Sequence, residues 1–244
     1  MRESEGISRS IKMFPAEPEL GAKSLRTIAR RALATALSAL TPFALALPVL
    51  SALPGLASAQ SSVGTLVAKP VSLPEMALGS PSAPITIVEF SSLTCSHCAA
   101  FAENVFPMLQ TKYIDTGKVR FVSREFPLEI KAAGASMLAR CAASGDAARY
   151  FEATTMLFKQ QEALIEHTTE TLKAVGGQFG MSGDAVEACV KDQRLLDKLT
   201  ADQKFAYDKL KVDATPTFFI NGTRVKGAMS FEELEARLTK LRKH

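Results

Sequence analysis

The sequence has almost no net charge beyond its first 59 residues. Residues 1–59 hold seven Lys or Arg against four Asp or Glu, which leaves 22 basic and 21 acidic residues in the rest of the chain. A surface this close to neutral gives no electrostatic basis for binding nucleic acid. The whole chain is 47% hydrophobic and 22% charged, a composition that excludes a disordered or fibrous protein. We therefore expect a globular chain with one core.

A second absence is the lack of charge between Ala32 and Leu56. Basic residues precede this apolar stretch, and small residues at positions 57–59 follow it. A basic part, an apolar part and a small-residue site in this order are typical of a secretory signal peptide. The sequence predicts that residues 1–59 are such a peptide, cleaved after Ala59. A membrane-anchored form stays open, because the apolar stretch is long enough to cross a bilayer.

Two short apolar runs near the middle of the chain predict strands. Residues 60–84 have little periodicity and are expected to be an extended N-terminal segment. Ile85–Phe90 and Val119–Ser123 are rich in β-branched and aromatic residues, as buried strands are. Between them, apolar residues at helical spacing predict one helix that runs toward Gly117. Those apolar residues are Phe101, Val105, Met108 and Leu109. The order predicts a right-handed βαβ unit with parallel strands.

Proline is absent from residues 131–210, where Ala, Leu, Glu and Lys are frequent. That composition predicts a helical insertion. After it, Thr217–Ile220 and residues 223–225 predict two antiparallel strands, because Asn221-Gly222 is a strong hairpin signal. The expected fold class is therefore α/β.

The last helix and the domain boundaries follow from the same pattern. Ser230 and Glu233 have the spacing of a capping box, which predicts the start of a final amphipathic helix. Residues 85–130 and 211–244 then form one sheet-containing domain, interrupted by the insertion.

Cys95 and Cys98 lie where the first predicted strand is followed by the helix. The unpaired amides and the dipole of a helix N-terminus favour a thiolate on the first cysteine, and a protonated His97 favours it further. A low thiol pKa makes Cys95 a good leaving group, so its disulfide with Cys98 is easily reduced and acts as an oxidant. We expect Cys95 to be the nucleophile and Cys98 the resolving thiol.

The positions of the other two cysteines bear on whether Cys95 and Cys98 belong to a metal site. A zinc site needs a second close pair of ligands, but Cys141 and Cys189 are 48 residues apart, so no metal or other cofactor is expected. An inert disulfide between Cys95 and Cys98 is a further alternative. Cys141 and Cys189 lie on predicted helices of an exported protein, where we predict a structural disulfide between them. Two separate buried thiols are the alternative.

Two motifs together resemble the DsbA-like thiol:disulfide oxidoreductases of the thioredoxin superfamily. They are EFSSLTCSHC at residues 89–98 and TPTFFING at residues 215–222. The resemblance extends over nearly the whole mature chain and implies a thioredoxin fold with an inserted helical domain. It implies that Cys95 attacks, that Cys98 is its buried partner, and that Pro216 is a cis-proline facing the disulfide. It also implies that Thr215 and Ser96 contact the substrate.

The resemblance further implies a role for Glu89, as the family's buried acid that relays a proton for the resolving cysteine. A carboxylate buried without a partner has a raised pKa and holds a proton near neutrality. The alternation of residues along the strand does not decide on which face Glu89 lies. A Glu89 that points to water is therefore the alternative. The dipeptide between the cysteines is Ser96-His97, whereas the best-known members have Pro-His. Because this dipeptide sets the redox potential, it bears on the oxidising strength.

These observations predict a periplasmic thiol:disulfide oxidoreductase that introduces disulfide bonds into exported proteins through Cys95 and Cys98. Its expected substrates are reduced exported polypeptides, and we expect it to act as a monomer. The resemblance implies reoxidation by a membrane quinone-linked oxidase of the DsbB type. One alternative is a disulfide isomerase or reductase of the same fold. A second, of another class, is a non-catalytic thiol-based metal-binding or chaperone protein, because thiolates bind soft metals.

Overall fold

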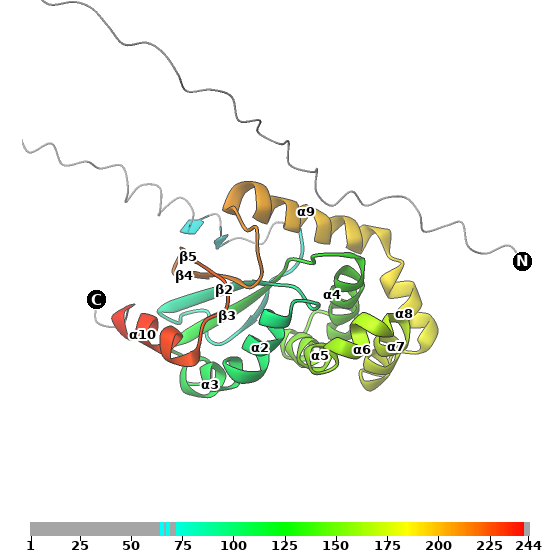
Figure 1. Ribbon diagram of the computed structural model, residues 1–244, viewed down its shortest axis with the longest axis horizontal. Helices are drawn as coiled ribbons and strands as arrows, with labels where there is room; N and C mark the ends of the chain where they lie inside the picture. Colours follow the sequence, from blue (N-terminus) through cyan, green and yellow to red (C-terminus); the bar gives the residue numbers. More distant parts are fainter. Residues whose placement is uncertain (1–63, 66, 69–71, 242–244) are drawn as a thin grey trace, which may run out of the picture. The chain divides into compact units, whose positions relative to one another are not determined.

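The computed structural model describes residues 64–65, 67–68 and 72–241 (Figure 1). The signal peptide expected at residues 1–59 lies outside the described residues. The described part is an α/β fold, as predicted, around a five-stranded sheet with the order β1-β3-β2-β4-β5. The strands are β1 (Met76–Leu78), β2 (Ile85–Ser91), β3 (Val119–Glu125), β4 (Thr217–Ile220) and β5 (Thr223–Lys226).

Pairing within the sheet confirms the predicted topology. Strands β2 and β3 are parallel, and β4 runs antiparallel to both β2 and β5. Between β4 and β5, Asn221 and Gly222 have φ of 46° and 82°, the left-handed conformation that a two-residue hairpin turn requires. Strand β1 was not predicted. It has three residues, too few to show a period, and it pairs antiparallel with β3.

The single helix expected between β2 and β3 is wrong in detail. The segment forms α2 (Ser96–Asn104), α3 (Phe106–Leu109) and a wider π-type turn, η1 (Gln110–Ile114). Pro107 lies in the first turn of α3, and its missing N–H breaks the hydrogen-bond ladder of a continuous helix. Met108, expected on the apolar face, is exposed as a result. Gly117 follows with φ of 72°, which suits the predicted end of this segment.

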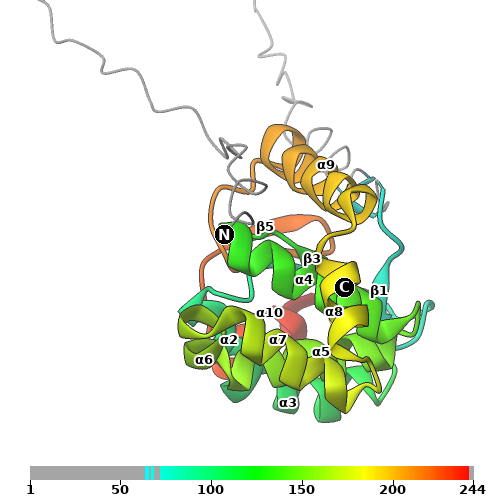
Figure 2. The ribbon, with the colours of Figure 1, turned by 90° about the vertical axis from the view of Figure 1, so that its right-hand side faces the viewer.

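The helical insertion lies between β3 and β4, and most of its helices group beside the sheet in Figure 1 and in front of it in Figure 2. Helix starts carry the side-chain caps that the sequence predicts. The Ser182 hydroxyl accepts from the Ala185 N–H at 3.1 Å, and Ser230 and Glu233 each cap the other's backbone N–H. The helices are α4 (Ile130–Ala143), α5 (Ala147–Lys159), α6 (Gln161–Glu166), α7 (Thr168–Gln178), α8 (Gly183–Val190), α9 (Gln193–Leu210) and the final α10 (Phe231–Leu241).

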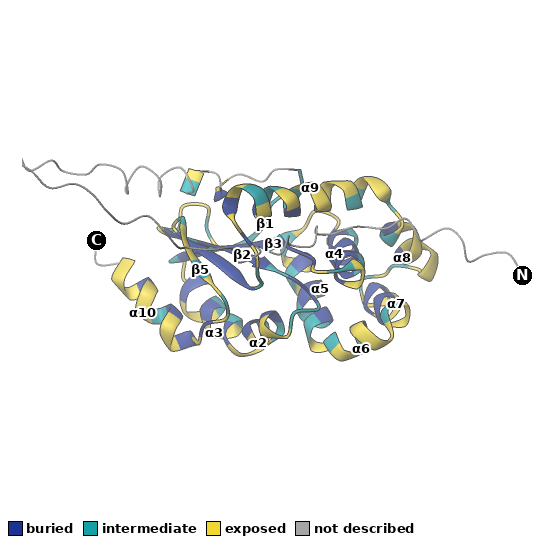
Figure 3. Ribbon diagram, turned by 45° about the horizontal axis from the view of Figure 1, so that its top comes forward, coloured by how far each residue is buried: buried dark blue, intermediate teal, exposed yellow. Residues whose placement is uncertain are grey.

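Helices cover both faces of the sheet, so its central strands are buried (Figure 3). Ile85 and Ile87 pack in one cluster with Phe101 of α2. Val88 and Phe90 point the other way and pack in a second cluster that includes side chains of α9. Because side chains alternate along a strand, the odd-numbered residues of β2 face α2. None of the described helices is long and apolar enough to span a membrane.

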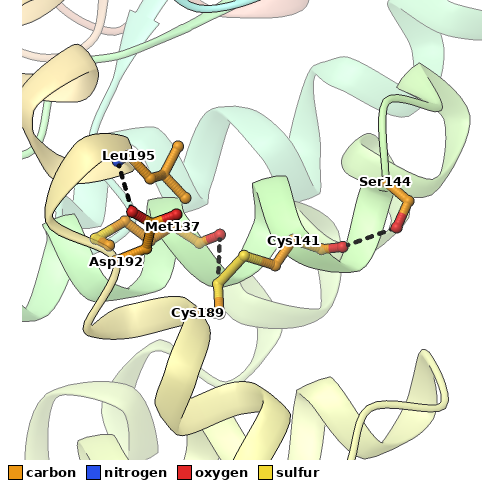
Figure 4. Close-up of a disulfide and its surroundings, with 6 residues drawn as sticks. All are labelled: Met137, Cys141, Ser144, Cys189, Asp192 and Leu195. Atoms are coloured by element: carbon orange, nitrogen blue, oxygen red, sulfur yellow. Dashed lines mark hydrogen bonds between the residues drawn. A yellow bond between two sulfur atoms is a disulfide. The ribbon is translucent and has the colours of Figure 1, made fainter.

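Two links hold the insertion together and join it to the sheet. Cys141 of α4 and Cys189 of α8 form a disulfide bond (Figure 4). One residue earlier, the Arg140 guanidinium donates to both carboxylate oxygens of Glu125 on β3, with Nη2 2.7 Å from Oε2. Both partners of this ion pair are buried. The ion pair therefore ties α4 to the end of β3 that pairs with Ser91, at the end of β2 that leads to Cys95.

Candidate functional site

The two remaining cysteines differ sharply in exposure. Cys95 is the residue before α2, with extended backbone at φ −85° and ψ 118°, and its side chain is half-buried. Cys98 lies in the first turn of the helix and is 0% exposed. Both are free thiols in this structure, and Ser96 and His97 between them are exposed. A polypeptide can therefore reach Cys95 but not Cys98.

Hydrogen bonds to its sulfur lower the pKa of Cys95 from 9.0 to about 5. The largest cause is the hydrogen bond from the Cys98 thiol, against which partial burial acts in the opposite direction. The Thr215 side chain and the backbone N–H groups of Cys98 and His97 also lower this pKa. His97 thus acts through its main chain, whereas the sequence argument relied on its imidazole. At neutral pH Cys95 is a thiolate.

The pKa of Cys98 is shifted the opposite way, far above its usual value. Burial is the largest cause, followed by the hydrogen bond to Cys95 and the charge of Glu89. Cys98 is therefore a thiol at neutral pH, and it needs a proton acceptor before it can act as a nucleophile.

Glu89 lies on the face of β2 that is turned toward α2. Only 7% of it is exposed, so the alternative that it points to water is wrong. Its neighbours across the sheet are Ser123 of β3 and Phe218 of β4. Burial, with a smaller contribution from the Cys95 charge, raises the pKa of Glu89 to about 8, while the Ser91 side chain acts against the rise. Glu89 therefore carries a proton at neutral pH and can release it slightly above.

Thr215 and Pro216 come from the far end of the sequence and lie against Cys95. The peptide bond between them is cis, and Cys95 Sγ lies 3.3 Å from the Thr215 carbonyl oxygen, to which it can donate when protonated. The segment just before β4 thus lies within hydrogen-bond distance of a residue 120 positions earlier. The structure therefore brings Cys95, Cys98, Thr215 and Pro216 together, with Glu89 beneath them.

Comparison with known proteins identifies the family to which this fold belongs. The family model described as thioredoxin matches residues 72–240. The structure resembles alpha-DsbA1 of Wolbachia pipientis, with a TM-score of 0.66 and 32% identity over 73% of this chain and 95% of that one. The chain belongs to the DsbA-like family of the thioredoxin superfamily.

A second solved structure and one further protein sequence also match this chain. Bacillus subtilis BdbD superposes with a TM-score of 0.62 at 21% identity, over 70% of this chain and 94% of that one. A Rickettsia bellii chain named as a protein-disulfide oxidoreductase is 33% identical over 168 residues, 68% of this chain. The present chain spans 64% of the length of that relative.

Two residues of this DsbA-like site were missed by the sequence argument. Gln161, the first residue of α6, donates through Nε2 to the carbonyl oxygens of Leu93 at 2.9 Å and Cys95 at 3.1 Å. It ties the insertion to the loop that carries the cysteines. Ser91 is the second missed residue, and strand alternation could have found it, because it lies two positions after Glu89. Nothing local marks Gln161, which is 66 residues from Cys95.

A pocket of about 40 Å³ lies beside the buried acid. Its lining includes Glu89, Ser91, Ser123, Tyr150 and Thr154. A space of this size with several polar groups in its wall has room for water. Within the described residues, no group of three or more His, Cys, Asp or Glu side chains is placed to hold a metal ion.

Proposed function

We propose that this protein oxidises pairs of thiols in reduced, exported polypeptides by donating the Cys95–Cys98 disulfide. The observation that carries the proposal is the contrast between the two thiols. The Cys95 pKa is about 5, whereas Cys98 is buried and protonated. A stabilised thiolate on Cys95 favours the reduced form, and a disulfide whose reduced form is favoured is a strong oxidant.

The reaction begins when a substrate thiolate attacks Cys95 Sγ. The Cys95–Cys98 bond breaks, a mixed disulfide forms, and Cys98 leaves as a thiolate that takes up a proton from Glu89. A second substrate thiolate then attacks the substrate sulfur of the mixed disulfide. Cys95 leaves as its stable thiolate, and the substrate keeps the new disulfide. Two electrons have passed from the substrate to the Cys95–Cys98 pair.

The segment before the cis-proline offers a docking edge for the substrate. Thr215 lies against Cys95 with its carbonyl oxygen directed to the sulfur. Cys95 has no hydrogen to donate in its disulfide, so this carbonyl is available to an extended chain that pairs as an added strand. Ser96, exposed at the start of α2, lies next to the sulfur that is attacked. We assign both residues to substrate contact.

The cellular setting belongs to the same proposal. The apolar stretch after a basic segment predicts export to the periplasm, where disulfides persist. There the reduced protein requires an electron acceptor, and we propose a membrane quinone-linked oxidase of the DsbB type. We propose that the protein acts as a monomer, since the residues gathered around Cys95 all come from one chain.

The equilibrium reduction potential of Cys95–Cys98 against glutathione tests the direction of the reaction. A value well above that of thioredoxin, about −270 mV, and toward about −120 mV is expected for an oxidase. A value near −270 mV would contradict the proposal and favour a reductase or isomerase. In parallel, Cys98→Ala is first loaded with glutathione as a mixed disulfide at Cys95. A reduced substrate thiolate is expected to attack Cys95 Sγ, release glutathione and leave an accumulated mixed disulfide with the substrate, since the resolving thiol is gone. Cys95→Ala is the matched control and forms none.

A metal-binding role is the competing function of another class. Two thiolates leave a tetrahedral site short of ligands, and no further cluster of ligands lies near them in the part of the chain that the structure describes. Metal that copurifies at one equivalent per chain, together with no adduct on Cys98→Ala, would favour that role over exchange.

A further inference from the structure

The hydroxyl of Ser91 is enclosed at the end of β2. Its oxygen is buried and makes no hydrogen bond of normal geometry among the described residues. A buried polar atom in this condition costs about 1–3 kcal/mol, and such an atom in a native fold calls for an explanation. The Ser91 backbone is paired separately, since its carbonyl oxygen accepts from the Phe126 N–H at 2.7 Å.

Strand alternation places Ser91 between the buried acid and the buried thiol. Ser91 lies two residues after Glu89 and therefore on the same face of β2. That face packs against α2, whose first turn holds Cys98. Glu89 and Ser91 also line the same pocket. The Ser91 side chain also lowers the pKa of Glu89 and the pKa of Cys98.

We propose that the Ser91 hydroxyl is the bridge through which a proton passes between Glu89 and Cys98. This inference rests on the proposed function, because only a dithiol that cycles between oxidation states needs such a transfer. A hydroxyl is suited to the task, since it can accept one hydrogen bond while it donates another. The absence of an ideal partner in the reduced form fits a group whose hydrogen bonds tighten during the reaction.

The transfer balances in both directions. When the disulfide is attacked, Cys98 leaves as a thiolate and accepts the proton of the Ser91 hydroxyl. Ser91 Oγ takes the proton of the Glu89 carboxylic acid in the same event, so Glu89 is left as a carboxylate. When the pair is reoxidised, the carboxylate removes the Ser91 proton and Ser91 removes that of the Cys98 thiol. The Cys98 thiolate then attacks Cys95 in its mixed disulfide with the oxidant.

A matched pair of variants isolates the hydroxyl. Ser91→Thr and Ser91→Val have nearly the same shape and both suit a strand, but only Thr keeps the hydroxyl. The oxidised variants are mixed with dithiothreitol, and the rate of reduction is followed from pH 5 to pH 9.5. We expect Val to be slower than Thr by about tenfold or more, within the range that general acid catalysis contributes.

The pH profile separates a relay from a structural effect. In the Thr variant the rate of Cys98 protonation falls as Glu89 loses its proton above about pH 8, whereas the Val variant lacks that decrease. The pKa of the Cys95 thiolate, measured by its absorbance, stays the same in both. In a Glu89→Gln background, the difference between Thr and Val is expected to vanish, because Gln has no proton to pass on.

Equal rates and equal pH profiles for Thr and Val would overturn the proposal, as would a Thr–Val difference that persists with Gln at position 89. If Val prevents folding, Ser91→Ala replaces it and is expected to lose the same high-pH decrease. An unaltered profile in Ala would also contradict the relay. Failure of the proposed function has a different signature, because the unmodified protein itself would then not oxidise a substrate dithiol.

Discussion

The lowered pKa of Cys95 predicts that reduction stabilises the folded protein in a pH-dependent manner. The perturbation is reduction of Cys95–Cys98 at a series of pH values. A thiol whose pKa is lowered by folding contributes stability that is full above its unfolded pKa and is lost as the pH falls through its folded pKa. Relative to the oxidised form, the reduced protein should therefore gain stability from about pH 5 upward and reach a plateau near pH 9.

The structure also gives the size of this effect. At pH 7, a shift from 9.0 to about 5 corresponds to about 2.7 kcal/mol. Solvent screens the charge of a half-buried sulfur, so we take about half of this value, about 1.4 kcal/mol. For a two-electron couple that is about 30 mV in reduction potential. Glu89, whose raised pKa destabilises the fold as the pH rises, is present in both forms and largely cancels in the difference.

Urea unfolding of the reduced and oxidised forms at pH 4, 5.5, 7 and 8.5 measures the effect. The Cys141–Cys189 bond must stay intact throughout, which thiol counting verifies. The control is Cys95→Ser, which forms no bond to Cys98 and cannot ionise in this range, so its stability relative to the oxidised protein should not rise with pH in this way. A stability difference that stays constant with pH, or that increases as the pH falls, would refute the assignment of a stabilised Cys95 thiolate.

Three other predictions concern the links around the site. Glu125→Gln leaves the Arg140 charge buried without a carboxylate, and urea unfolding should show a loss of about 3–5 kcal/mol. Gln161→Ala removes two hydrogen bonds to the loop that carries Cys95, so amide hydrogen exchange in that loop should become faster. The free energy of unfolding should fall by about 1–2 kcal/mol. Unchanged exchange and stability would contradict this prediction. Replacing Cys141 and Cys189 together by Ser opens a loop of 48 residues and should cost about 4 kcal/mol in thermal or urea unfolding.

The parts of the fold that could be predicted from the sequence are those with local signals. The Asn221-Gly222 turn and the capping box at Ser230 form as expected, because each depends on residues only a few positions apart. The unbroken helix after Cys98 was wrong because the periodicity of apolar residues was given more weight than Pro107. A single missing N–H outweighs a regular apolar spacing when the helix is short.

The contacts that position the site were beyond local reasoning. Gln161 is 68 residues from Leu93, and the Arg140–Glu125 pair joins an insertion helix to a strand. Neither pairing leaves a pattern in one sequence, because only the packing of α4 and α6 beside the sheet brings these side chains together. The motif therefore identifies which residues react, while their support comes from contacts that need the folded chain.

The orientation of Glu89 could not be predicted from the sequence pattern of β2. Alternation indicates a face only when one side of a sheet meets water. Here Ile87 packs on one side of β2 and Val88 on the other, so both sets of residues are apolar. The decisive fact is that α2 covers the odd-numbered face. Once Cys98 is placed above that face, Glu89 and Ser91 must both lie beneath it, and a proton can reach the buried sulfur without crossing the strand.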